Sequence, residues 1–460
     1  MKILQEIIRQ GGLPYFCGGY VRDSLLGVQS KDIDVEVFGM EAEKLHSVLS
    51  KFGKVDDVGQ SFGVLKIKYE GIDYDFSLPR TEKKNGSGYK GFDIMPDPNL
   101  SLEMAAARRD FTFNAIYMGT DGKLYDPYNG ALDLKYGILS ATSPAYVECS
   151  LRPVRGFQLA SRFNLKADEK TVYLSRLLLD ESKTLSQERI RIEWLKWCKG
   201  SYPKAGLDFL EQCGYIQNYP TLDVLQFIPQ HVEYYPEGAS NINQKGVWQK
   251  GVWEHTKYVC QAMAKICDRE GIHGVRRQEL FFSALLHDVG KVNTTVVNKK
   301  GNWASPRHDK TGVPIAKKFL EETLGILTMS KKVLPLISEH MVHYEYKERN
   351  PSSKSVKKLA FRLGDASIED LALLIEADYA GRPPLKESPV GIFKILNLAR
   401  YLGVNLQAEK ALVSGQDLIE IGYKPGVSFG KMLEFAYNLQ FNGFSKDKIL
   451  KQIQGNFKQW

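Results

Sequence analysis

The sequence predicts an α+β protein: a mixed sheet with helices in the N-terminal part, followed by an all-α body. Two observations predict this class. Short strand-like runs bounded by glycine turns lie within the first 140 residues, whereas apolar residues recur at helical spacing in later segments. The chain of 460 residues, 43% of them hydrophobic, is long enough for about three domains with buried cores.

The composition suits a polyanionic partner and a reducing compartment. The formal net charge is +8, from 62 Lys and Arg against 54 Asp and Glu. The six cysteines include no CxxC pair, which argues against a disulfide framework or a zinc ribbon. The chain shows no signal-peptide pattern and no apolar run of membrane-spanning length, so we expect a cytoplasmic protein with no membrane partner. The oligomeric state is not indicated.

A glycine turn, CGGYVRD, occupies residues 17–23. Gly18 and Gly19 let backbone N–H groups approach a phosphate because no Cβ intervenes, and a helix beginning near Val21 would direct its positive end to the same place. Arg22 adds a cation at this turn. The sequence therefore predicts a cradle for a nucleoside triphosphate.

Two carboxylates follow in KDID, before an apolar run. Asp32 and Asp34 are spaced i, i+2, so in a strand both side chains leave the same face and can hold Mg²⁺ between them. Such a site activates an attacking hydroxyl and stabilises a leaving pyrophosphate. A glycine turn before an acidic surface strand is the alternative for either motif alone; the two in this order favour nucleotidyl transfer.

GGYVRD followed by DID resembles the DNA polymerase beta superfamily of nucleotidyltransferases, in the branch of bacterial tRNA CCA-adding enzymes and poly(A) polymerases. The resemblance implies a polymerase-beta-like head over residues 1–140, with a third carboxylate on a later strand. Asp75, with Asp73 on the same face, is the candidate; an exposed polar position on a half-buried strand is the alternative. It also implies that residues 80–91 form a flexible loop that helps to rearrange the site between CTP and ATP addition.

RRDFTFNA, at residues 108–115, resembles the family's RRDFTxNA element. Adjacent arginines suit phosphate and ribose recognition because each guanidinium offers a planar fork of donors. The resemblance assigns nucleotide binding to Arg108, Arg109, Asp110 and Asn114. The acidic residue that the family usually carries just upstream is absent from residues 104–107, which read MAAA.

Residues 141–230 are expected to form a helical neck that contains the base-reading element. The family's E-D-x-x-R pattern, whose Asp and Arg recognise the incoming base, aligns with Glu148, Cys149 and Arg152, and Arg155 matches downstream. A thiol is a weak acceptor, so Cys149 in place of Asp costs one charge-assisted hydrogen bond to the exocyclic amine, roughly 1.5–3 kcal/mol. Strict selection of CTP and ATP is therefore left open by the sequence.

A second constellation lies in residues 231–400. Its order, H…HD…D, resembles the HD phosphohydrolase superfamily, in which imidazoles and carboxylates on packed helices bind a divalent transition metal such as Ni²⁺, Mn²⁺ or Co²⁺. His308 and His340 occupy further positions seen in HD proteins with larger sites. Lys291 and Arg307 are weaker candidates for holding a substrate phosphate. The ligands that the resemblance implies are His255, His287, Asp288, His308, His340 and Asp378.

A nucleotidyltransferase head joined to an HD domain resembles the bacterial multifunctional CCA-adding enzymes, with a short helical tail over residues 401–460. The resemblance implies CCA addition to the 3′ end of tRNA from CTP and ATP, with an HD phosphatase or 2′,3′-cyclic phosphodiesterase activity. Two alternatives stay open. One is a paralogue with a different nucleotide or RNA specificity because of Cys149; the other is a non-catalytic RNA- or nucleotide-binding head that serves an HD phosphohydrolase.

Overall fold

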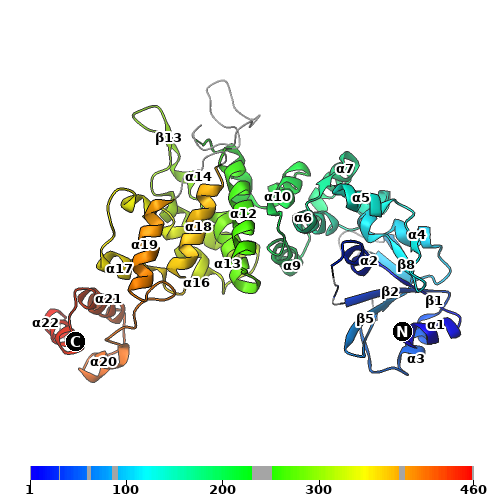
Figure 1. Cartoon of the computed structure of the whole chain (residues 1–460), viewed down its shortest axis with the longest axis horizontal. Helices are drawn as coiled ribbons and strands as arrows, with labels where there is room; N and C mark the ends of the chain where they lie inside the picture. The colour runs from blue at the N-terminus through cyan, green and yellow to red at the C-terminus, as the bar shows by residue number, and fades with distance from the viewer. Residues whose placement is uncertain are drawn as a thin grey trace. The chain divides into compact units, whose positions relative to one another are not determined.

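The computed structural model describes residues 2–28, 30, 32–59, 64–84, 92–230, 251–382 and 389–457. The chain divides into two compact units, Met1–Pro220 and Thr221–Trp460 (Figure 1). Unit 1 contains both sheet and helices, and unit 2 is almost entirely helical. This is the α+β class that the sequence predicts.

In the described part of unit 1, a seven-stranded mixed sheet has the order β3-β4-β5-β2-β1-β8-β9. The central pair, β2 and β5, is parallel, and its register places Asp32 opposite Asp73 and Asp34 opposite Asp75. The strands are β1 (Leu13–Phe16), β2 (Asp32–Phe38), β3 (Val55–Gly59), β4 (Val64–Tyr69), β5 (Ile72–Ser77), β8 (Tyr117–Gly119) and β9 (Leu124–Tyr125).

Helices α1 (Lys2–Arg9) and α3 (Ala42–Leu49) supply the apolar partners of this sheet. In β2, alternate residues Ile33, Val35 and Val37 are buried in the same core as apolar side chains of both helices. Because side chains of a strand alternate between faces, this burial leaves Asp32 and Asp34 on the opposite face of β2. Packing of the core thus fixes where the carboxylates point.

A separate hairpin follows the sheet. Strands β6 (Arg80–Lys84) and β7 (Phe92–Pro96) pair antiparallel, with Thr81 opposite Met95. The prediction of a flexible loop over residues 80–91 is therefore wrong for residues 80–84, because their backbone pairs with β7 and forms a strand. The rest of that loop, residues 85–91, lies outside the described residues.

The remainder of unit 1 is a helical neck. Phe157 of α6 packs against Trp194 and Trp197 of α9, with ring centroids 4.7 and 5.6 Å away. A Cβ at Gly206 would lie 2.6 Å from the Phe157 carbonyl oxygen, so this glycine permits close approach of α10 to α6. The elements are α4 (Leu102–Ala107), α5 (Gly130–Tyr136), α6 (Arg152–Phe163), α7 (Glu169–Leu177), α8 (Leu179–Ser182), α9 (Gln187–Trp197) and α10 (Pro203–Gln212), with a two-residue parallel pair, β10 (Ile138–Leu139) and β11 (Lys166–Ala167).

Unit 2 packs its helices around α12 and α13 and ends in a tail with a core of its own. Leu418, Met432 and Ile449 lie in that tail core. The helices are α11 (Pro220–Asp223), α12 (Gly251–Arg269), α13 (Gly274–Leu286), α14 (Lys291–Thr294), α15 (His308–Lys318), α16 (Ser330–Glu339), α17 (Ser353–Leu363), α18 (Ile368–Ala380), α19 (Val390–Tyr401), α20 (Gly415–Glu420), α21 (Ser428–Gln440) and α22 (Lys446–Asn456). One hairpin, β12 (Val296–Val297) with β13 (Trp303–Ala304), interrupts the all-α pattern. None of the described helices combines the length and hydropathy that a membrane crossing requires.

Candidate functional site

The glycine turn packs directly onto the carboxylate strand. The Cys17 amide donates to the Asp34 carbonyl at 3.0 Å. Helix α2 (Gly18–Leu25) begins at Gly18 rather than near Val21, and Gly18 adopts φ +62°. A Cβ there would lie 3.3 Å from Asp34 Oδ2 and 3.2 Å from Arg109 Nη1. Both the backbone conformation and the contact with Asp34 therefore favour glycine.

Three carboxylates line this part of the sheet. Asp32 is exposed and Asp34 is half-buried on the same face of β2, and Asp75 lies beside Asp34 on β5. Lys66 Nζ pairs with Asp75 Oδ2 at 2.6 Å. Burial raises the pKa of Asp34; Arg109 opposes the rise, and Asp75 and Asp32 add to it. Clustered carboxylates with such a raised pKa are a donor set whose repulsion a hard divalent cation relieves, so these residues fit Mg²⁺.

Four of the predicted nucleotide-binding residues form a connected chain of hydrogen bonds. Arg22 donates to Asn114 Oδ1 at 2.8 Å, and Asn114 Nδ2 donates to Asp110 Oδ1 at 3.0 Å. Arg155 Nε then donates to Asp110 Oδ2 at 2.7 Å. Burial alone would raise the pKa of Asp110, but Arg155 and Asn114 lower it to about 2. The glycine turn, the RRDFTFNA element and α6 are thereby held together.

Two residues in the site were not predicted from the sequence: Glu36 and Tyr117. Glu36 is buried on β2, two residues after Asp34, and accepts from Arg109 Nη2 and from Tyr117 Oη, both at 2.7 Å. The Arg109 guanidinium also lies 5.2 Å from the centroid of the Tyr117 ring. The i, i+2 repeat of acids in DIDVE was the available signal. Arg109 is therefore held against the glycine turn by side chains from two strands.

Replacing Glu36 with Gln is expected to lower kcat/KM for the incoming nucleotide by about tenfold to a hundredfold, because a hydrogen bond to a charged group contributes about 1.5–3 kcal/mol. The measurement is single-nucleotide incorporation with varied nucleotide concentration. The control is Glu43→Gln, an exposed position on α3. Wild-type kcat/KM in Glu36→Gln would contradict a role for Glu36 in positioning Arg109.

The residues expected to read the base line the same cavity, but the guanidinium of Arg152 is already hydrogen-bonded to the main chain. Its guanidinium donates to the Ala145 carbonyl at 2.6 Å and to the Arg108 carbonyl, and the residue is buried. Arg108 Nη2 in turn pairs with Glu148 at 2.7 Å. The Cys149 side chain is partly exposed and lines the cavity. The cavity has a volume of about 1330 Å³ and is lined by the glycine turn, Asp34, Asp75, Arg108, Arg109, Asp110, Asn114, Cys149, Arg152 and Arg155, among others.

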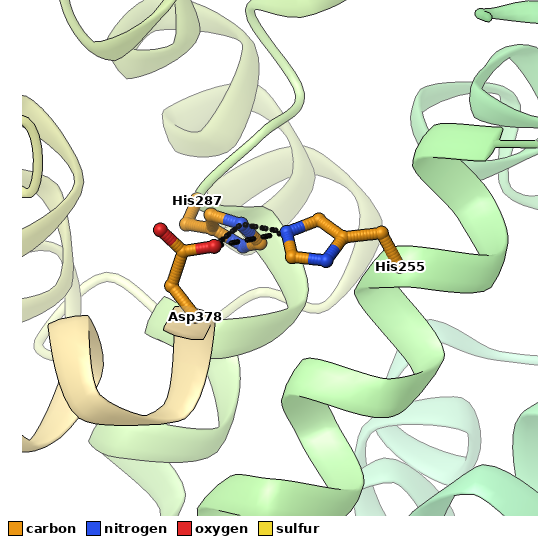
Figure 2. Close-up of side chains that lie close together, drawn as sticks. All are labelled: His255, His287 and Asp378. Carbon is orange, nitrogen blue, oxygen red and sulfur yellow. Dashed lines mark hydrogen bonds and ion pairs between the residues drawn. The ribbon is translucent and has the colours of Figure 1, made fainter. Parts of the chain in front are cut away.

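The second cluster gathers all six residues expected in unit 2. His255, His287 and Asp378 form one group, and Figure 2 shows their side chains converging from three helical segments. His255 Nε2 lies 3.0 Å from Asp378 Oδ1 and 3.3 Å from His287 Nε2. Asp288, His308 and His340 form the other group, with His308 Nε2 3.1 Å from both Asp288 Oδ1 and His340 Nε2. Asp288 Oδ2 lies 3.2 Å from His287 Nε2, so this carboxylate spans both groups.

Backbone carbonyls orient all four imidazoles of the second cluster. A carbonyl only accepts, so each Nδ1 carries the proton and leaves Nε2 as a potential ligand atom. The distances from Nδ1 to the carbonyl oxygens are 3.2 Å for His255 to Gly381, 2.8 Å for His287 to Ala284, 2.7 Å for His308 to Ser305 and 2.7 Å for His340 to Ile337.

The electrostatics of this cluster also fit a cation. Burial, His308 and His287 hold the pKa of His340 well below its usual value, which favours the neutral, ligating form. Burial opposes ionisation of Asp288, but His287 and Lys291 hold its pKa well below the usual range. Burial opposes protonation of His287, but Asp288 and Asp378 raise its pKa, so this imidazole must lose a proton when it binds a metal. Neutral imidazoles with ionised carboxylates are the donors that divalent transition metals prefer.

Two basic residues border the cluster. Lys291 Nζ lies 2.7 Å from Asp288 Oδ2, and Arg382 donates to both oxygens of Asp378 at 2.8 Å. Both line a cavity of about 280 Å³ that reaches Asp288, His308, His340 and Asp378. Arg307 is exposed and is not among the described residues that line this cavity. Arg382, which the sequence did not single out, lines this cavity where Arg307 was expected.

Replacing Gly290 with Ala is expected to destabilise this cluster. A Cβ at Gly290 would lie 2.0 Å from the His308 carbonyl oxygen and 2.5 Å from the Gly312 amide nitrogen, so α15 must move. Such overpacking costs about 1–3 kcal/mol. The expected result is a lower melting temperature and weaker metal binding, measured by calorimetry. The control is Gly430→Ala, where a Cβ meets nothing within 4 Å; equal effects of both substitutions would contradict the packing argument.

Comparison with known proteins agrees with both halves of this description. Residues 14–140 match the Poly A polymerase head domain family, and residues 252–377 match the HD domain family. The multifunctional CCA protein of Vibrio vulnificus is 30% identical over 413 residues, which covers 87% of this chain and 93% of that protein. The multifunctional CCA protein of Vibrio parahaemolyticus is 31% identical over 425 residues, covering 89% and 94%.

The fold agrees as well. The crystal structure of the Bacillus stearothermophilus CCA-adding enzyme in complex with CTP aligns with a TM-score of 0.59 at 19% identity, over 99% of this chain and 96% of that chain. At that identity the likeness shows the fold alone. Because both domain families match in this order and the relatives are covered almost end to end, the chain belongs to the family of multifunctional CCA proteins.

Proposed function

We propose that unit 1 is a template-independent RNA nucleotidyltransferase that adds or repairs the tRNA 3′ CCA end from CTP and ATP. The observation that carries this proposal is the packing of the Gly18 turn against Asp34, on a strand face that also carries Asp32. Gly18, Gly19, Asp34 and Asp75 line one cavity, so a triphosphate on the glycine turn would lie beside the proposed metal site. Membership of the family of multifunctional CCA proteins supports the substrate assignment.

The side chains of this cavity have separate roles in the proposal. Asp32, Asp34 and Asp75 would hold Mg²⁺, which when bound activates the RNA 3′ hydroxyl and stabilises the leaving pyrophosphate. Gly18 and Gly19 admit the triphosphate to backbone N–H groups. Arg22, Asp110 and Asn114 brace the turn, while Arg108 and Arg109 supply cations to phosphate and ribose. The tRNA would be bound mainly through its shape and backbone.

A second candidate, a paralogue with altered nucleotide specificity, is favoured by one observation. The base reader expected from the family is Asp with Arg, yet Cys149 carries no carboxylate and Arg152 donates to two main-chain carbonyls. Reading a base with Arg152 would require it to leave these carbonyls. The residues expected to select the nucleotide can therefore differ from those of the family while the residues proposed for nucleotidyl transfer are retained.

One assay distinguishes these candidates. Purified protein is incubated with tRNA lacking its 3′ CCA and with each nucleoside triphosphate singly, next to Cys149→Asp. We expect wild type to add CTP and then ATP, with discrimination against UTP improved about tenfold to a hundredfold in Cys149→Asp. Addition of another nucleotide by wild type, with CTP and ATP selection restored by Cys149→Asp, would establish the paralogue. No incorporation by either protein would leave the head as a binding module.

We infer that unit 2 is a metal-dependent phosphohydrolase, acting as a phosphatase or 2′,3′-cyclic phosphodiesterase. Two groups of three ligands that share the Asp288 carboxylate suit two cations. A metal such as Ni²⁺, Mn²⁺ or Co²⁺ supplies, when bound, a more acidic water for attack on a phosphoester. Lys291 and Arg382 would orient the phosphate and balance its charge. Location in the cytoplasm stays a prediction.

A further inference from the structure

We propose that the β12–β13 hairpin binds single-stranded RNA and leads an RNA 3′ end into the cavity of unit 2. The substrate of that site is then the end of an oligonucleotide rather than a free mononucleotide. This inference rests on the phosphohydrolase function proposed above, and it adds a binding surface and a substrate class to it.

The hairpin precedes His308 in the sequence and lines the same cavity as the candidate metal ligands. It follows α14 and ends a few residues before His308, and Figure 1 shows the loop at the label β13 standing out from the helices of unit 2. Trp303, Ala304 and Ser305 line the same cavity as Asp288. One end of the hairpin therefore forms a wall of the candidate active site, while its tip extends outward.

The tip is held in a defined conformation. Val297 is opposite Trp303, and the Asn298 amide donates to the Asn302 carbonyl at 2.8 Å, which closes a three-residue loop over residues 299–301. Gly301 has φ +79°, as such hairpin loops require at their last position. Asn298 Oδ1 also accepts from the Lys300 amide at 2.9 Å and the Asn302 amide at 3.1 Å. The two lysines thus project from a structured turn.

The charge of this segment is of one sign. Residues 289–308 include four cationic side chains and no Asp or Glu. Lys299, Lys300 and Arg307 are exposed, and Lys291 lies in the cavity. Cations on a segment that also forms a wall of a candidate site for phosphoester chemistry suit a polyanion, since neutralised phosphates release their counterions.

The hairpin also exposes apolar side chains on both sides of the two lysines in the sequence. Val296 and Val297 are 52% and 55% exposed, and the Trp303 ring is half-buried at the cavity wall. Stacking of a base on an aromatic side chain contributes about 1–3 kcal/mol. A strand rises about 3.3 Å per residue, so the loop lies roughly 10 Å beyond Trp303. A ligand that contacts both is therefore longer than one nucleotide. Residues 289–308 carry cations and no Asp or Glu, which favours the repeating phosphates of RNA over a protein partner of mixed charge.

The test compares two substrates of the same chemistry. The full-length protein is loaded with Mn²⁺, and kcat/KM is measured for a 2′,3′-cyclic mononucleotide and for a short single-stranded oligoribonucleotide that ends in a 2′,3′-cyclic phosphate. For Lys299→Ala/Lys300→Ala, the ratio of oligonucleotide to mononucleotide kcat/KM is expected to fall about tenfold, mainly through KM. The salt dependence should lessen by about 1.4 in log–log slope, since each single-strand phosphate contact contributes about 0.7.

The matched control is Lys317→Ala/Lys318→Ala on α15, where the side chains are 57% and 70% exposed. The control should keep the wild-type ratio. Trp303→Leu should lower the ratio, and Trp303→Phe should restore most of it if stacking is responsible. An unchanged ratio in both the lysine variant and Trp303→Leu would overturn the inference while leaving the phosphohydrolase intact.

Failure of the underlying function gives a different result. If wild type hydrolyses neither substrate with Mn²⁺, Ni²⁺ or Co²⁺, the proposed phosphohydrolase activity is wrong. The hairpin is then tested by the fluorescence anisotropy of a labelled oligoribonucleotide. Binding of this RNA by unit 1 is the same in all variants, so a difference in affinity between variants reports on the hairpin. Weaker binding by the hairpin variant than by the α15 control would still support the surface, and equal binding would reject it.

Discussion

Replacing Asp34 with Asn is expected to abolish nucleotide addition. The substitution keeps the size of the side chain but removes the negative charge that lies at the glycine turn and beside Asp75. If the metal clamp contributes at least about 4 kcal/mol to the transition state, the rate falls by about 10³-fold or more. The measurement is single-turnover incorporation of CTP into tRNA lacking CCA, with Mg²⁺ varied.

Two controls separate chemistry from folding. Asp56→Asn changes an exposed carboxylate on β3 and should leave incorporation unchanged. Hydrolysis by unit 2 should also survive in Asp34→Asn. Loss of the charge at Asp34 should raise rather than lower stability, because burial and neighbouring carboxylates already raise its pKa and disfavour its ionised form. Incorporation by Asp34→Asn at even one-tenth of the wild-type rate would contradict the assignment of this carboxylate.

Replacing Asp288 with Asn is expected to remove hydrolysis and to weaken metal binding at both groups of ligands. Asp288 Oδ1 lies 3.1 Å from His308 Nε2 and Oδ2 lies 3.2 Å from His287 Nε2, so one carboxylate serves both sides of the cluster. Asn keeps the shape but offers one neutral oxygen ligand. Bound Mn²⁺ is measured by elemental analysis after equilibrium dialysis, in chains that also carry Asp34→Asn so that the candidate metal site of unit 1 contributes little. We expect it to fall from about two per chain to below one, and hydrolysis to fall about 10³-fold.

The matched control for this prediction is Asp309→Asn, which removes a carboxylate on the first turn of α15 that lies 3.7 Å from Lys310. It should keep both metals and hydrolysis. CCA addition should persist in Asp288→Asn, because the residues proposed for nucleotide addition lie in unit 1 and Asp288 lies in unit 2. Retention of two cations by Asp288→Asn would show that this carboxylate is not shared. Binding of a single cation when Asp288 is intact and Asp34→Asn is present would show that one group of ligands suffices.

The sequence predicted much of the fold and the composition of both sites because their residues are in short motifs. GGYVRD, DID, RRDFTFNA and the H…HD…D order each place chemically distinctive side chains at fixed separations. Local spacing was sufficient for Asp32 and Asp34, since alternation along a strand settles which side chains share a face. The α+β class and the family resemblance are confirmed. The roles of the individual residues stay predictions until the substitutions above are measured.

Other features depend on contacts between segments far apart in the chain, which no motif encodes. Glu36 meets Arg109 across 73 positions, and Lys66 reaches Asp75 only because β4 and β5 pair in one register. Arg152 was expected to face the base, but packing of its helix against the Ala145 and Arg108 carbonyls engages it. Arg382, rather than Arg307, lines the cavity of unit 2 for the same reason.

The sequence by itself therefore determined which chemical groups this protein carries: a glycine turn with paired carboxylates, and six candidate metal ligands. Only the tertiary structure decided how those groups are partnered. Burial in the sheet placed Glu36 within hydrogen-bond distance of Arg109, and helix packing turned each of the four imidazoles so that Nδ1 donates to a carbonyl and Nε2 faces the cluster. The physical reason is that residue type fixes a side chain's donors and acceptors, whereas register and packing decide which of them meet.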